Sequence, residues 1–126
     1  MDTVISPKYQ KLFQEAHERY HIGAAFFMQY LQYWFNNQEI TATSLSDLLS
    51  LPAPQCNWFD YAMSTNLRGQ WLYNLVAAHI PTHAKRYLDV GCGYGGCIIA
   101  FAEHGYEAFG IDIDETLLLL ARCNTK

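Results

Sequence analysis

The sequence "RYLDVGCGYGG", residues 86–96, guides the interpretation of the whole chain because it fits two glycine-rich patterns at once. The first pattern, G-x-G-x-x-G, uses Gly91, Gly93 and Gly96. The second, D-x-G-x-G-x-G, places Asp89 before the glycines and ends on Gly95. A strand that passes through a glycine turn into a helix exposes backbone N–H groups at the helix N-terminus. Both patterns therefore predict a cofactor-binding loop, and they differ in the charge of the ligand.

Strands and helices are expected to alternate from residue 87 onward. "YLDVG" reads as a short apolar strand, and "GGCIIAFAEHG" as a helix that closes at Gly105. "YEAFGID" reads as a second strand, followed by the helix "DETLLLLARC" with Asp114 as its N-cap. This order predicts two parallel strands joined by a right-handed crossover. We therefore assign residues 85–126 to the N-terminal half of a Rossmann-like domain, in the α/β class.

The first 84 residues read as a helical segment rich in aromatic side chains. A helix is expected to start at Ser6-Pro7, with the serine oxygen able to accept a free backbone N–H. Gly23 is a predicted break, and the next helix is expected to end near Asn36-Asn37. The apolar stripes of these two helices are Leu12, Phe13 and Ala16, then Phe26, Tyr30, Tyr33 and Trp34. The aromatic stripe favours a core role, with a substrate-facing lid as the alternative.

Two more helical stretches follow. Ser44 precedes Asp47 by three residues, which resembles a capping box, and Pro52 and Pro54 are expected to stop that short helix. Helical spacing then runs over residues 58–80 until Pro81. The apolar face of this long stretch is predicted to hold Leu67, Trp71, Leu75 and Ala78.

Composition excludes several classes of partner. The 126 residues are 51% hydrophobic with a net charge of -4, and residues 86–126 carry three basic and six acidic side chains. Nucleic acid is therefore an unfavourable partner. The four cysteines show no C-x-x-C spacing, which indicates free thiols in a reducing cytoplasm. We expect no membrane span and no secretory signal.

Two acidic residues suggest which cofactor the loop holds. Asp112 follows Gly91 by 21 residues, at the end of the second strand, where a carboxylate can accept both hydroxyls of a ribose. Asp89 would repel the pyrophosphate of a dinucleotide such as NAD. The same carboxylate attracts the sulfonium and ammonium groups of S-adenosylmethionine. The pattern therefore favours S-adenosylmethionine.

"YLDVGCGYGG" followed by "GYEAFGIDIDETLLLLAR" resembles the glycine motif and the following acidic strand of class I S-adenosylmethionine-dependent methyltransferases. The resemblance covers residues 87–122 and is specific, since the acid, the glycines, the helix and "GID" occur in order. "NLRGQWLYNLVAAHIP" is similar, less specifically, to the helix that precedes the first strand in that family. The chain thus resembles the N-terminal part of such an enzyme.

The resemblance implies roles for individual residues. Asp89, Gly91 and Gly93 would line the methionine end of the cofactor, Asp112 would bind the ribose, and Ile113 would pack against the adenine. Gly95 and Gly96 would let the helix approach the sheet closely. The predicted cofactor-binding residues are Asp89, Gly91, Cys92, Gly93, Gly95, Asp112 and Ile113. Catalytic residues stay unassigned, and the acceptor is expected to be a small molecule or a protein.

Other candidate groups have simpler interpretations. His17 and His21 stand one helical turn apart but lack a third ligand, so we interpret them as surface residues and predict no metal site. Cys92 lies inside the loop with no histidine near it in sequence, and packing is the favoured role. Asp114 is favoured as a helix cap.

The chain stops after the second predicted helix, whereas the family has a seven-stranded sheet. We expect either a fragment of a longer methyltransferase, which is favoured, or a partner chain, including a homodimer formed through the exposed sheet edge. The 126 residues alone are expected to self-associate and to show no methyl transfer. The alternatives are a non-catalytic S-adenosylmethionine-binding regulatory module and an NAD(P)-binding Rossmann fragment.

Overall fold

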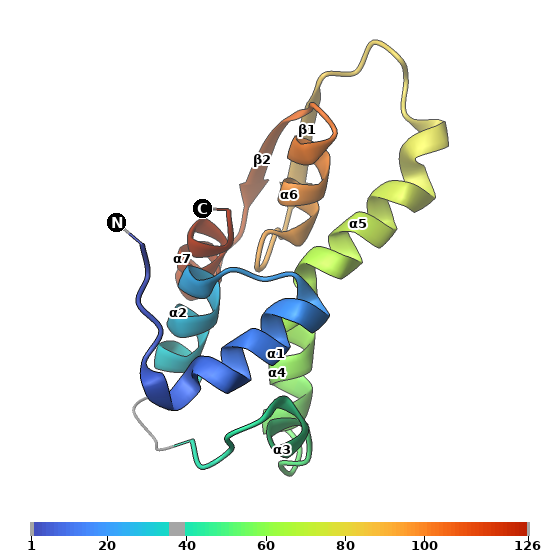
Figure 1. The fold of residues 1–126 in the computed structure, drawn as a ribbon. Coiled ribbons are helices and arrows are strands. Elements are labelled where there is room, and N and C mark those ends of the chain that lie inside the picture. Colours follow the sequence, from blue (N-terminus) through green and yellow to red (C-terminus); the bar gives the residue numbers. More distant parts are fainter. Residues whose placement is uncertain (1, 36–39, 126) are drawn as a thin grey trace. The chain divides into compact units, whose positions relative to one another are not determined.

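The computed structural model describes residues 2–35 and 40–125, which form two compact units (Figure 1). One unit ends at Ser64, and the other spans Thr65–Thr125. The sequence pattern predicts a boundary between the helical segment and the Rossmann-like segment at residues 84 and 85. Contacts divide the chain after Ser64, because the helix that follows packs on the helix that lies between the two strands in sequence.

The first unit is helical. A 3₁₀ turn at Pro7–Tyr9 leads into α1 (Gln10–Tyr20), and α2 (Ala24–Trp34), α3 (Leu45–Leu49) and α4 (Gln55–Met63) follow. The start at Pro7 and the break at Gly23 are confirmed, but the Ser6 side chain caps no N–H group. The helix end predicted at Asn36-Asn37 lies outside the described residues.

The aromatic stripe of α2 divides between core and surface. Phe26 and Tyr30 are buried, whereas Tyr33 and Trp34 are 42% and 45% exposed. Tyr20 of α1 is also buried, and its hydroxyl donates to the Asp60 carboxylate of α4 at 2.6 Å. Burial raises the pKa of Tyr20, and the hydrogen bond to Asp60 raises it further. The core prediction is therefore confirmed for the first half of the stripe.

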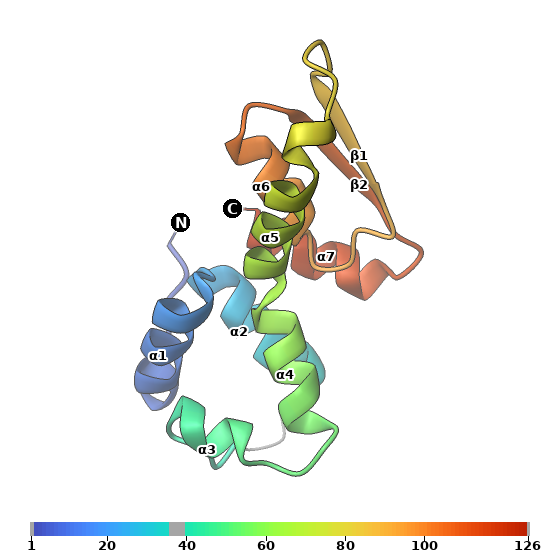
Figure 2. The ribbon, with the colours of Figure 1, turned by 90° about the vertical axis from the view of Figure 1, so that its right-hand side faces the viewer.

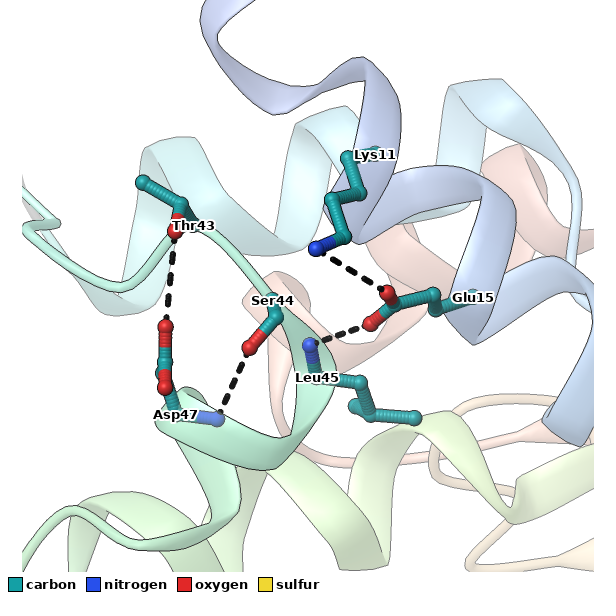
Figure 3. Close-up of polar contacts among 6 residues, drawn as sticks. All are labelled: Lys11, Glu15, Thr43, Ser44, Leu45 and Asp47. Atoms are coloured by element: carbon teal, nitrogen blue, oxygen red, sulfur yellow. Dashed lines mark hydrogen bonds and ion pairs between the residues drawn. The ribbon is translucent and has the colours of Figure 1, made fainter.

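The N-terminus of α3 is capped from two directions (Figure 3). The Asp47 N–H donates to the Ser44 hydroxyl oxygen at 3.1 Å, as the capping pattern predicts. The Leu45 N–H donates to the Glu15 carboxylate of α1 at 2.6 Å. Lys11, one turn before Glu15 on α1, lies 3.9 Å from that carboxylate. Glu15 thus satisfies a free helix N–H and joins α3 to α1.

The long helix predicted over residues 58–80 is wrong in two respects. It is interrupted at Ser64, so that α4 ends at Met63, and α5 (Thr65–Val76) and a 3₁₀ turn (Ala77–His79) follow. The predicted apolar face is also exposed, since its members Leu67, Trp71, Leu75 and Ala78 all face solvent.

The physical reason for this exposure is a close crossing of α5 over α6 (Gly96–Glu103) (Figure 2). The buried residues of α5 are Thr65 and Gly69. A Cβ atom at Gly69 would overlap the Gly96 carbonyl, and one at Gly96 would overlap the Thr65 carbonyl. The buried face of α5 is therefore formed by small residues, and the large apolar side chains lie on the exposed face.

The second unit contains the predicted parallel pair. β1 (Arg86–Val90) and β2 (Glu107–Ile111) flank α6 in sequence, and α7 (Glu115–Asn124) follows β2. The strands pair in parallel from Arg86 opposite Glu107 to Val90 opposite Ile111. The fold is α/β, with a partial Rossmann-like sheet preceded by helices, as predicted.

The two faces of this sheet differ in cover. Tyr87 and Asp89 of β1 are half-buried, and the Tyr87 ring stacks on Phe101 of α6 with centroids 3.7 Å apart. The opposite face is exposed, with Leu88 at 57% and Val90 at 73%. Exposed and half-buried side chains alternate along β2 in the same way, and Phe109 and Ile111 are 49% and 53% exposed. Within the described residues the sheet has two strands, so each strand has one unpaired edge.

Candidate functional site

The glycine loop between β1 and α6 folds back onto the end of β2. The N–H groups of Gly91 and Cys92 both donate to the Ile111 carbonyl, at 2.7 Å and 2.9 Å. The Gly95 N–H donates to the Cys92 carbonyl at 3.0 Å. Gly91, Gly93 and Gly95 have positive φ angles of 79°, 53° and 85°. The alternating glycines of the motif therefore supply left-handed backbone at every second position.

Asp112 ties this loop to the turn before α7. Its Oδ2 accepts the Gly93 N–H at 2.9 Å, and its Oδ1 accepts the Asp114 N–H at 2.9 Å. These hydrogen bonds, with the Asp114 one foremost, lower the pKa of Asp112 below its usual range. The structure thus brings together two predicted site residues, Asp112 and Gly93, through a contact that the sequence did not predict.

Asp89 has the opposite electrostatic environment. Burial raises its pKa above the usual carboxyl range, and the charge of Asp112 raises it further. The repulsion arises because hydrogen bonds from backbone N–H groups keep Asp112 ionised. Asp89 and Asp112 therefore repel one another, and a cation at the loop would be favoured.

Cys92 is buried and packs over β2. A Cβ atom at Gly110 would lie 2.8 Å from the Cys92 Sγ, so the thiol fills the space that this glycine leaves. Burial raises the pKa of Cys92, and the charges of Asp89 and Asp112 add to that shift. A thiol with a raised pKa is a poor nucleophile. The geometry therefore supports the packing role of Cys92. All four cysteines are free, as predicted.

Gly95 and Gly96 allow the helices α7 and α5 to approach the loop closely. A Cβ atom at Gly95 would lie 3.3 Å from the Ala121 Cβ of α7. Gly96 lies against Thr65 at the start of α5. The role of these glycines in the approach of α6 to the sheet stays a prediction. They join the loop to α7 and α5.

The segment after β2 places Ile113 in solvent. Its side chain is 103% exposed, directly after Asp112, so contact with an adenine stays a prediction. Asp114 accepts the N–H groups of Thr116 and Leu117 at 2.9 Å and 3.2 Å. The predicted N-cap role of Asp114 is confirmed.

A cavity of about 300 Å³ lies beside the loop on the α7 side of β2. Asp112 and Cys92 contribute to its wall, and the rest is mainly apolar. The lining residues are Cys92, Ile98, Gly110, Ile111, Asp112, Leu118, Ala121, Arg122 and Thr125. Ile113 does not line this cavity. Its exposed side chain and the cavity are therefore two separate apolar surfaces near Asp112.

The histidines outside the loop have structural contacts. His17 and His21 are both exposed, as predicted, and the His17 ring lies 2.8 Å from the Ile22 carbonyl. His104 stacks on Tyr73 with ring centroids 3.7 Å apart. In the part of the chain that the structure describes, no three His, Cys, Asp or Glu side chains form a metal-binding group. Within the same residues, no helix has the length and apolar character needed to cross a bilayer.

Sequence reasoning missed residues whose partners are distant in the chain. Asn66 of α5 and Asn124 of α7 form a pair next to the loop, and Gly69 and Gly110 provide room for Gly96 and Cys92. A glycine inside a strand or helix is a signal for close approach, which could have identified Gly69 and Gly110. Nothing in the local sequence marks either asparagine.

Comparison with known proteins gives two partial matches. The chain is 40% identical over 73 residues to a protein of Geobacillus sp. (strain WCH70) with the name "Putative methyltransferase". It is 38% identical over 64 residues to "Putative methyltransferase YqeM" of Bacillus subtilis (strain 168). The comparisons favour a methyltransferase.

These matches cover 55% and 51% of this chain, but only 29% and 25% of the two relatives. The chain therefore spans less than a third of the length of the curated relatives that it matches. No protein-family profile matches the chain, and no solved structure matches it.

Proposed function

We propose that the second unit binds S-adenosylmethionine and is the cofactor-binding N-terminal portion of a class I S-adenosylmethionine-dependent methyltransferase. The observation that carries this proposal is the position of Asp112, whose carboxylate is fixed by the N–H groups of Gly93 and Asp114. A carboxylate offers about four acceptor positions, and these two bonds leave about two for the hydroxyls of a ribose. The same side chain would therefore shape the loop and bind the nucleoside.

The charge of the site supports a cationic cofactor over a dinucleotide. Asp89 and Asp112 form a negative region beside the glycine loop, and burial followed by repulsion from Asp112 raises the pKa of Asp89. A pyrophosphate would add two negative charges to this region. A sulfonium and an ammonium group would relieve the repulsion. This argument disfavours the NAD(P)-binding alternative.

The described residues act by binding and orientation. When bound, the cofactor would supply a methyl group on a sulfonium, which passes in line to an acceptor nucleophile as the C–S bond breaks and the neutral thioether leaves, so positioning provides much of the acceleration. Gly93 leaves open space above the loop, since a Cβ atom there would meet no atom within 4 Å. Asp112 and the loop N–H groups would hold the nucleoside end. The names of the two relatives favour an enzyme over a non-catalytic binding module.

Removing the Asp112 carboxylate is expected to weaken cofactor binding strongly. Asp112→Ala removes the acceptor for the ribose and also frees the Gly93 N–H, and losing a charged hydrogen-bond acceptor costs about 1.5–3 kcal/mol. Affinity for S-adenosylhomocysteine should therefore fall by at least about tenfold. Calorimetric titration measures this change. Glu107→Ala at the opposite end of β2 is the control, and an Asp112→Ala affinity within twofold of the unmodified protein would exclude the ribose role.

Cofactor affinity is expected to rise with pH through the pKa of Asp89. That pKa is raised in the free protein, so Asp89 is neutral below it, and a bound cation favours the ionised form. Asp112 stays ionised across the same interval because its pKa is lowered. Calorimetry with S-adenosylmethionine between about pH 4 and pH 7 should show increasing affinity that levels off above the Asp89 pKa. Asp89→Asn should remove this increase.

The free energy of unfolding should fall as pH rises, whereas cofactor affinity should increase. This difference distinguishes an effect on binding from an effect on folding. A carboxyl group with a raised pKa in the folded state gives stability that decreases as pH rises through that pKa. Asp89→Asn should therefore be more stable than the unmodified protein at pH 7 while binding the cofactor less tightly. Denaturant unfolding measures the stability. An unchanged pH dependence of binding in Asp89→Asn would refute a cofactor role for this carboxylate.

The remaining features of the proposal concern partners and location. We propose a small-molecule or protein methyl acceptor, a cytoplasmic location, and no nucleic-acid or membrane partner. The unpaired strand edges also support self-association of the 126 residues through the sheet.

A further inference from the structure

Two asparagines hold the glycine loop through a contact separate from that of Asp112. The Asn124 side-chain amide donates to the Tyr94 carbonyl at 2.9 Å and to the Asn66 Oδ1 at 2.8 Å. The Asn66 amide donates back to the Asn124 Oδ1 at 3.1 Å. Asn124 is the last residue of α7, and Asn66 lies in the first turn of α5. The pair thus connects two helix ends to one loop carbonyl.

The position of this carbonyl in the loop gives the contact its significance. The Tyr94 C=O belongs to the same peptide unit as the Gly95 N–H, and Gly95 is the N-cap residue of α6. The Gly93 N–H, two peptide units earlier in the loop, is held by Asp112. Asp112 precedes α7 and Asn124 is its last residue, so two nearby groups of the loop are held from the two ends of α7. The conformation of Gly93 and Gly95 then depends on two side-chain contacts.

The Asn124 contacts lie in a partly buried environment. Tyr94 is 6% exposed and Asn124 is half-buried. A carbonyl that loses its donor in such a place is left without full hydrogen bonding, which disfavours that conformation. The Asn124 amide therefore stabilises the particular loop shape seen here, in addition to the packing of α7.

We propose that Asn124 is a positioning residue for the cofactor, and that Asn66 holds its amide in the orientation that donates to Tyr94. This inference rests on the proposed function, since it assigns the loop shape to cofactor binding. Asn124 acts through the loop backbone.

Three exchanges of asparagine for aspartate, each nearly isosteric, test the inference in the full chain. Asn124→Asp removes the donor to Tyr94 and places a carboxylate against its carbonyl. Asn66→Asp adds the same charge to the same cluster, but Asn124 can still donate to both Tyr94 and residue 66. Asn74→Asp is the matched control, since Asn74 lies on α5, is exposed, and accepts a hydrogen bond from Gln70 that aspartate retains.

Calorimetry with S-adenosylhomocysteine should show a loss of at least about tenfold for Asn124→Asp, about threefold for Asn66→Asp, and less than twofold for Asn74→Asp. Amide NMR spectra should show the Gly93 and Gly95 signals shifted in Asn124→Asp and unshifted in Asn74→Asp. A role confined to folding would lower thermal stability but leave the affinity of the folded protein unchanged.

The possible outcomes distinguish failure of this inference from failure of the proposed function. If the unmodified protein does not bind S-adenosylhomocysteine, the proposed function fails. If it binds and Asn124→Asp binds equally well, the positioning role is overturned. If Asn124→Asp does not fold, the inference depends on Asn66→Asp, and an affinity equal to that of Asn74→Asp would then overturn it.

Discussion

Gly96→Ala is expected to destabilise the second unit by about 3 kcal/mol, the upper part of the range for an overpacked core. A Cβ atom at Gly96 would overlap the backbone carbonyl of Thr65, and backbone atoms cannot move aside as a flexible side chain can. Either α5 separates from α6, or the start of α6 shifts together with the loop. Denaturant unfolding followed by circular dichroism measures the loss.

The partner position and a remote glycine provide the comparison. Gly69→Ala should have a similar effect, because its Cβ would overlap the Gly96 carbonyl from the other side of the crossing. Gly23→Ala should cost much less, since a Cβ atom at Gly23 would have no atom within 4 Å and its φ is -89°. Equal stability of all three variants would show that α5 and α6 do not cross at these glycines.

Gly93→Val is expected to abolish cofactor binding, whereas Cys92→Ala retains it. Gly93 has a φ of 53°, which a β-branched residue adopts only with strain. The space around its missing side chain is open, so valine would extend to where the cofactor is expected. Cys92 points instead toward Gly110, and its shortening leaves a small cavity in the packing. Calorimetry with S-adenosylhomocysteine measures both variants.

Comparing the two variants distinguishes a requirement for open space at Gly93 from a chemical role of the Cys92 thiol. Gly93→Val should remain folded, because the contacts of α5 with α6 do not involve Gly93. A Gly93→Val protein with normal affinity would place the cofactor elsewhere. A Cys92→Ala protein that binds the cofactor but, in the full-length enzyme, transfers no methyl group would support a nucleophilic role for Cys92.

Local sequence patterns predicted the parts of the fold that depend on neighbouring residues. The strands around "YLDVG" and "YEAFGID", the crossover helix and the N-caps at Ser44 and Asp114 all occur where spacing and capping chemistry placed them. Each of these features is determined by apolar periodicity, by glycine or by a side chain within three residues of its partner. The acid and glycine positions of the candidate site were predicted on the same basis.

Features that depend on distant partners could not be predicted in this way. The apolar spacing that continues past Ser64 conceals the break between α4 and α5. Apolar periodicity predicts a core position for Trp71, but Trp71 is exposed and Gly69 on the other side of α5 makes the close contact. Asn66 and Asn124 are 58 residues apart, and their pairing requires that the ends of α5 and α7 meet.

The order in which the loop and its partner strand occur in the chain has a consequence for biosynthesis. Gly91 and Cys92 leave the ribosome before Ile111, whose carbonyl accepts both of their N–H groups. The loop therefore cannot acquire its final hydrogen bonds until α6 has folded back and β2 has paired with β1. The proposed cofactor site is thus a late product of folding, and a nascent chain in which β2 has not yet paired with β1 lacks the loop conformation that the proposal requires.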